Sequence, residues 1–113
     1  MRWLLVFAFV LAGCSRGPGA DLQYIKQARS LGAEWALVNK QAAQGKLTKT
    51  YVSSMHESLR EQLQSSSTSL SRPDSRYAIE IQALLHQPDD AAPEELRAHA
   101  DKLKQIEDQL ESA

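Results

Sequence analysis

Three histidines, one cysteine and a run of hydroxyl side chains are the residues of this 113-residue chain whose types could do chemistry. The histidines, His56, His86 and His99, are the side chains that titrate nearest neutral pH. They form no His-x3-His pair, and the sequence shows no carboxylate-rich helix seam of the kind that binds two metal ions. The sequence therefore predicts no metal ligand and no cofactor.

Two of the histidines are expected to have structural roles. His56 stands between Met55, which falls on an apolar stripe, and Glu57. We therefore predict a solvent-facing or edge position for His56. His99 falls on the core face of a predicted helix, but it can turn aside if Ala100 takes the buried place.

His86 is the histidine closest to a possible cation site, because Asp89 and Asp90 follow it. Two aspartates and one imidazole at a helix end could hold a cation weakly. A basic side chain at the C-terminus of a helix also complements the helix dipole, and this simpler interpretation is favoured.

The run of hydroxyls comprises Ser65, Ser66, Ser67, Thr68 and Ser69. A hydroxyl nucleophile needs a base within hydrogen-bond reach and an oxyanion site. The chain has no glycine elbow and no phosphate-cradling loop. We therefore predict no catalytic residues and no enzymatic activity.

The single cysteine closes a short leader segment. Arg2 is followed by an unbroken apolar run over residues 3–12, which as a helix would cover about 15 Å, half of a bilayer's hydrocarbon core. Such a run is too short for an ordinary transmembrane span. It ends in Leu11-Ala12-Gly13-Cys14, and this motif resembles the lipobox of bacterial lipoprotein precursors.

The resemblance implies cleavage between Gly13 and Cys14, a diacylglyceryl group on the cysteine sulfur and acylation of the freed amine. Ser15 follows the cysteine in place of the aspartate that often retains such proteins in the inner membrane, which favours the outer membrane with the domain in the periplasm. Residues 1–13 are then the signal peptide and 14–20 a lipid-anchored flexible tether. The alternative is an ordinary cleaved signal with a chance cysteine.

The remaining residues, 21–113, are expected to form one all-α domain. Apolar residues recur every three or four positions and no segment shows strand alternation. The pattern predicts a small antiparallel bundle of three to four amphipathic helices over about 21–45, 48–71, 73–87 and 91–111, joined by short turns.

In the first helix, Asp21 is the expected N-cap and Gly45 the expected C-terminal stop. Gly32 inside the helix is either a close helix contact or a local weakness. The expected buried stripe consists of Tyr24, Ala28, Leu31, Trp35, Val38 and Ala42.

In the second helix, Thr48 is the expected N-cap, with Leu47 and Val52 spaced as a hydrophobic staple. Residues 64–69 (QSSSTS) are indifferent helix formers, so they are either helical or a serine-rich loop. The expected buried face consists of Val52, Met55, Leu59, Leu63, Ser66 and Leu70.

Pro73 suits the first turn of the third helix, with Ser71 and Asp74 spaced as a capping box. Glu94 and Glu95 suit the first turn of the fourth. The expected buried faces are Tyr77, Ala78, Ile81, Leu84 and Leu85 in the third helix, and Leu96, His99, Ala100, Leu103, Ile106 and Leu110 in the fourth.

Charge is divided unevenly along the chain. Residues 14–72 contain eight basic and four acidic side chains, whereas residues 73–113 contain four basic and ten acidic ones. The two halves should attract each other, which favours packing within the bundle and is the preferred interpretation. The alternative is that the basic half, next to the tether, faces anionic head groups while the acidic end projects to a partner. A formal charge of -1 and a pI near 6.3 give no basic footprint for nucleic acid.

Two functions are compatible with these features. The favoured one is a lipid-anchored, non-enzymatic interaction or accessory module of the cell envelope, bound to the membrane through Cys14 and to an envelope protein partner. The alternative is a small-ligand or metal carrier that uses the bundle interior. That interior is small, because only 23 large apolar side chains follow the leader.

Overall fold

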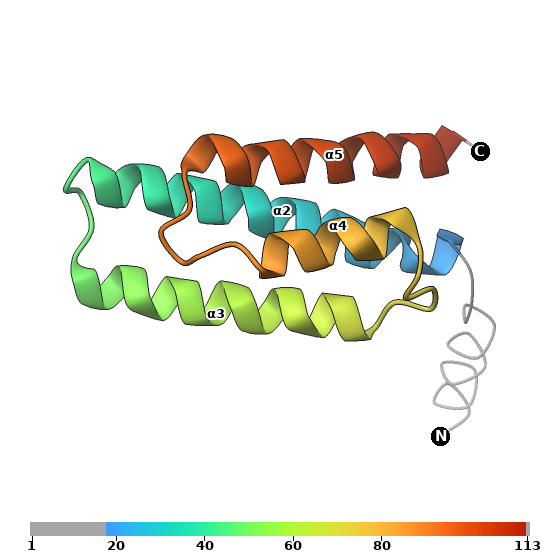
Figure 1. Cartoon of the computed structure of the whole chain (residues 1–113), viewed down its shortest axis with the longest axis horizontal. Coiled ribbons are helices and arrows are strands. Elements are labelled where there is room, and N and C mark those ends of the chain that lie inside the picture. The colour runs from blue at the N-terminus through green and yellow to red at the C-terminus, as the bar shows by residue number, and fades with distance from the viewer. Residues whose placement is uncertain (1–17, 113) are drawn as a thin grey trace, which may run out of the picture.

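The computed structural model describes residues 18–112 as four helices with no strand in that range. They are α2 (Pro18–Ala43), α3 (Lys49–Thr68), α4 (Arg76–Leu85) and α5 (Pro93–Ser112). Figure 1 shows the chain turning back at each of the three connections. α2 contacts all three other helices, most extensively α5 and then α3. The predicted all-α bundle is confirmed.

The core lies where the apolar faces of the four helices meet. Trp35 is fully buried, as its place in the predicted stripe requires. The stripe on α2 is wider than predicted, because Ile25 and Ala36 are also fully buried while Tyr24 is only half-buried. A helix packed against three neighbours buries more than one narrow stripe. The other large core residues are Leu59, Leu63, Tyr77, Ile81, Leu84, Leu96 and Leu103.

Several helix ends agree with the sequence signals. Thr48 is the N-cap of α3, where its hydroxyl accepts a hydrogen bond from the Tyr51 N–H at 3.1 Å. Gly45, with φ of +72°, follows the end of α2 in a left-handed conformation that glycine adopts without steric cost. The serine-rich run is helical through Thr68, so of the two alternatives for residues 64–69 the loop is wrong.

The start of α2 differs from the prediction. The helix begins at Pro18 and not at Asp21, so residues 18–20 of the predicted tether are helical. Proline is well suited to the first turn, because its missing N–H would have no partner there. Asp21 lies within that turn and is buried. The lipobox, with the rest of residues 1–17, lies outside the described residues.

The start of α4 also differs. The helix begins at Arg76, with Ser75 as its N-cap accepting from the Ala78 N–H at 3.2 Å. The predicted capping box of Ser71 and Asp74 is therefore wrong. Ser71 instead donates its hydroxyl and its backbone N–H to the carboxylate of a residue 50 positions earlier, which local spacing cannot indicate.

Gly32 is a position of close helix contact. A Cβ placed on it would lie 3.1 Å from Cδ2 of Leu84 on α4 and 3.5 Å from Cβ of Ala100 on α5. The missing side chain lets α2 approach both neighbours. Among the described helices, none combines the length and apolar character that crossing a bilayer requires.

Candidate functional site

The most connected polar cluster holds the segment between α4 and α5. Arg60 on α3 donates from Nη1 to the Leu85 carbonyl at 2.7 Å and from Nη2 to the Gln87 carbonyl at 2.5 Å. Its Nε lies 2.6 Å from Oδ1 of Asp89. The guanidinium also covers the ring of Trp35, with Cζ 4.9 Å from the centroid. One side chain thus joins α3, α2 and the segment after α4.

Asn39 on α2 completes this attachment. Its Nδ2 donates to the carbonyls of Asp89 and Ala91, each at 2.9 Å, and Nε1 of Trp35 donates to the same Asp89 carbonyl at 3.0 Å. Oδ1 of Asn39 lies 2.7 Å from Nε2 of His56. Because the amide oxygen can only accept, Nε2 of His56 carries a proton.

A pocket of about 330 Å³ opens beside this cluster, between the end of α2, the start of α3 and the start of α5. Its lining consists of Asn39, Ala42, Ala43, Val52, His56, Asp90, Ala91 and Pro93. A second hollow of about 260 Å³ shares Ala42, Val52 and His56 with it. The lining is mostly apolar, and His56 is its most buried ionisable residue.

The prediction of a solvent-facing or edge position for His56 is wrong, because only 9% of the residue is exposed. The buried face of α3 passes through His56, Leu59, Leu63 and Ser66, one position beyond Met55. The sequence contained one signal for this burial, because His56 lies at three-four spacing from Leu59 and Leu63. Its partner, Asn39, lies 17 residues away, so the sequence did not show how its burial is compensated.

His86 and His99 lie away from this pocket. His86 is the exposed C-cap of α4, and its Nδ1 donates to the Gln82 carbonyl at 2.7 Å. The predicted position of His86 at the C-terminus of this helix is therefore confirmed. Within residues 18–112, His86 does not join Asp89 and Asp90 in a group with metal-ligand spacing.

His99, placed on the core face by the sequence, is only half-buried between α4 and α5, and Ala100 takes the buried place, which was the alternative left open for it. Its Nδ1 contacts the carboxylate of Glu80, and its Nε2 lies 3.2 Å from Nε2 of Gln87. The ring is therefore engaged at both nitrogens. His99 links two helices and is not free to bind a ligand.

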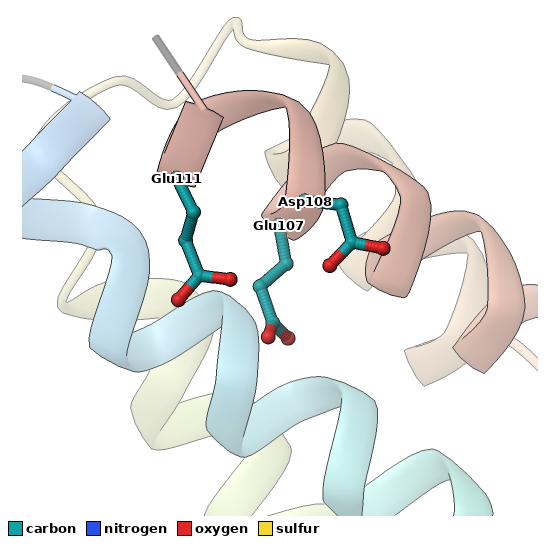
Figure 2. A group of neighbouring side chains, drawn as sticks. All are labelled: Glu107, Asp108 and Glu111. Carbon is teal, nitrogen blue, oxygen red and sulfur yellow. The ribbon is translucent and has the colours of Figure 1, made fainter.

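The described residues contain one acidic group with close ligand atoms, formed by Glu107, Asp108 and Glu111. Figure 2 shows all three on the last turns of α5, with Glu107 and Glu111 reaching toward α2. Their carboxylate oxygens lie within 4.8 Å of one another. Glu107 is only 3% exposed, whereas the other two are exposed.

Basic side chains neutralise this group. Nε of Arg29 lies 2.7 Å from Oε1 of Glu107, and Nζ of Lys104 lies 3.5 Å from the other oxygen. Nζ of Lys26 lies 2.9 Å from Glu111. The acidic group is therefore part of an ion-pair network. The pairs of Lys26 and Arg29 join the basic half of the chain to its acidic half, in agreement with the expected attraction between them.

A second buried carboxylate fixes the beginning of the bundle. Asp21 is 1% exposed and accepts hydrogen bonds from the Tyr77 hydroxyl at 2.5 Å, the Ser71 N–H at 2.9 Å and the Ser71 hydroxyl at 3.0 Å. Burial, and then the hydrogen bond to Asp21, raise the pKa of Tyr77 above its ordinary value. The first turn of α2 is thereby attached to α4 and to the segment before it.

Comparison of the chain with protein-family models, with curated proteins and with solved structures gives no match in any of the three.

Proposed function

We propose that this chain is a lipid-anchored lipoprotein of the bacterial cell envelope that serves as a non-enzymatic interaction or accessory module. The observation that carries the proposal is the motif Leu11-Ala12-Gly13-Cys14, which ends four positions before α2 begins at Pro18. Acyl chains on Cys14 would leave three residues between the anchor and the helix. Two or more such chains hold a protein stably at a bilayer.

The arrangement of the bundle supports a defined orientation relative to such an anchor. Asp21 fixes the first turn of α2 to Ser71 and Tyr77. Figure 1 places the start of α2 and the end of α5 at one end of the bundle and the turn after α2 at the other. Ala42, in the pocket lining, is about 36 Å along the helix from Pro18 at 1.5 Å per residue. In this proposal the protein is anchored in the outer membrane, and the end of the bundle that carries the pocket faces the periplasm.

The buried polar side chains support a role in which the bundle presents a fixed surface at the membrane and catalyses no reaction. Asp21, Arg60 and Glu107 each bind other parts of the same chain. Such pairs stabilise a fixed bundle that can present a surface to an envelope protein. The membrane would raise the effective concentration of both proteins, so a weak contact would suffice.

The anchor is tested by metabolic labelling with palmitate in bacteria that express the full chain. We expect label on the wild-type protein and on the control Ser15→Ala, and none on Cys14→Ser. The wild-type protein should also partition into detergent, and the Cys14→Ser protein should not. Equal labelling of Cys14→Ser would overturn the lipoprotein assignment.

The partner is tested by crosslinking in intact cells followed by mass spectrometry. We expect a reproducible envelope protein that is captured less by the Cys14→Ser form. Charge reversal at Glu94 and Glu95, which are exposed in the first turn of α5, tests whether the acidic half contributes to the contact. Recovery of the full chain without any crosslinked protein would count against the interaction role.

A small-ligand carrier is a second candidate, and one specific observation favours it. The pocket beside His56 is apolar and is adjacent to the surface, in contrast to the interior site expected from the sequence. The core residues of the four helices, Trp35 and Leu103 among them, fill the bundle centre. A carrier function would therefore use the pocket at the end of the bundle.

A further inference from the structure

We propose that the pocket formed by the end of α2, the start of α3 and residues 90–93 binds a small apolar molecule that carries one hydrogen-bond donor. This inference goes beyond the envelope role proposed above, and it holds whether or not Cys14 is acylated. It rests on three properties of the pocket, namely its size, its apolar lining and one nitrogen of the lining residue His56 that makes no hydrogen bond within residues 18–112 and is not fully buried.

The size and lining favour a compact apolar body. The volume of about 330 Å³ is at the low end for ligand pockets in proteins and suits a single ring. The apolar part of the lining comes from Ala42, Ala43, Val52, Ala91 and Pro93. Removing an apolar ring from water onto these side chains is favourable in proportion to the area buried.

The polar part of the lining can accept hydrogen bonds but has little to donate. Nε2–H of His56 is used by Oδ1 of Asn39, and both amide hydrogens of Asn39 are used by the carbonyls of Asp89 and Ala91. In the neutral ring, Nδ1 of His56 then carries a lone pair. Nδ1 makes no hydrogen bond with any residue in 18–112.

Asp90, which is exposed, also lines the pocket, and its carboxylate is the other hydrogen-bond acceptor among the lining side chains whose bonding capacity is not used up by the contacts above. A ligand whose polar end is a hydroxyl or an N–H can donate to Nδ1 of His56. A ligand of the same shape with an ether or carbonyl oxygen would place the oxygen lone pair against the lone pair of Nδ1 of His56. Neither atom would then have a hydrogen-bond partner. The pocket should therefore distinguish donors from acceptors.

The proposal is tested with 4-fluorophenol as the probe and 4-fluoroanisole as its matched partner without a donor. The full chain is reconstituted in lipid nanodiscs, and empty nanodiscs correct for partition of the probes into lipid. Binding is followed by fluorine NMR at about pH 8. We expect saturable binding of 4-fluorophenol about fivefold or more tighter than that of 4-fluoroanisole, from one net hydrogen bond.

Two variants and one control locate the binding. His56→Phe keeps a ring in the lining but removes the acceptor, so the preference for 4-fluorophenol should disappear. Because this change also breaks the bond to Asn39 and can lower stability, Ala42→Phe provides an independent test by filling the pocket without removing a hydrogen bond. His86→Ala, at an exposed histidine outside the pocket lining, should bind both probes as the wild type does.

Saturable binding that prefers 4-fluorophenol and is lost in folded Ala42→Phe would support the proposal. Three outcomes would overturn it: no saturable binding of 4-fluorophenol, equal affinity for the two probes, or unchanged binding in folded Ala42→Phe. Circular dichroism of each variant establishes that the bundle is folded.

Discussion

The guanidinium of Arg60 lies over the ring of Trp35, with 4.9 Å between Cζ and the ring centroid, and both side chains bind the same residue, Asp89. Trp35 donates to its backbone carbonyl, whereas Arg60 binds its carboxylate. The cation and the ring therefore hold the connection between α4 and α5 from two helices at once. This arrangement makes Arg60 the residue whose shape, and not only whose charge, should matter for stability.

Arg60→Lys should lower the free energy of unfolding by about 2 kcal/mol, because lysine keeps the charge but loses the planar fork. The lost contacts are the stacking on Trp35 and the paired bonds to the carbonyls of Leu85 and Gln87. Urea denaturation followed by circular dichroism measures the change. Arg97→Lys on the exposed side of α5 is the matched control, expected within about 0.5 kcal/mol of wild type. Equal effects of the two substitutions would contradict the assigned role of Arg60.

Tyr77 should make stability depend on alkaline pH. Burial and the bond to Asp21 raise the pKa of Tyr77 in the folded protein, so the folded state keeps a proton that the unfolded chain releases near pH 10. The corresponding stability is fully present below the unfolded pKa and is lost as pH rises through the folded pKa. Urea midpoints measured from about pH 8 to 11 should fall less steeply for Tyr77→Phe than for wild type. Tyr51→Phe, at a half-exposed ring, is the matched control, and a slope unaltered by Tyr77→Phe would refute this prediction.

Gly32→Ala should lower the free energy of unfolding in the wild-type protein and raise it when Leu84 is replaced by a smaller residue. The added methyl would lie 3.1 Å from Cδ2 of Leu84, which is fully buried, so crowding should exceed the gain in helix propensity of about 1 kcal/mol. In the Leu84→Ala background the crowding is gone and the propensity gain remains. Thermal or urea unfolding of the four proteins gives the coupling free energy. The same sign in both backgrounds would mean that Leu84 does not limit the approach of the helices.

Glu107 should be more important for stability than its acidic neighbour. Glu107→Ala removes a buried carboxylate and leaves Arg29, whose side chain is 34% exposed, without its partner, which should cost about 2 kcal/mol. Asp108→Ala removes an exposed carboxylate and should cost less than about 1 kcal/mol. Chemical denaturation of both variants at low and at moderate salt provides the comparison. A loss at Asp108 as large as that at Glu107 would contradict the difference in burial.

The apolar part of the fold follows from the sequence, because burial of one helix face requires apolar residues at three-four spacing. Leu59 and Leu63, and likewise Leu96 and Leu103, were predicted in this way and are fully buried. Ser66 was predicted on the buried face of α3 and is buried, whereas the buried polar residues Asp21, Asn39, His56 and Glu107 were missed. Asp21 fits the same spacing as Ile25, but a carboxylate is normally assigned to the surface unless its partners are known.

The candidate site could not be predicted, because it depends on contacts between distant segments. Asn39 binds the Ala91 carbonyl 52 positions away and His56 17 positions away, and no local pattern specifies either contact.

The start of α4 likewise depends on a contact between distant segments. Ser71 and Ser75 are both plausible caps by local spacing, and the bond from Ser71 to Asp21 decides between them.

The attachment of residues 86–92 to the bundle also affects the susceptibility of this segment to proteolysis. A protease binds its substrate as an extended strand, so a peptide segment must first leave the folded body over several residues. In this connection the carbonyls of Gln87, Asp89 and Ala91 accept bonds from side chains of α2 and α3. Withdrawing the segment would therefore break its bonds to two helices together, which should protect a stretch without regular secondary structure from cleavage.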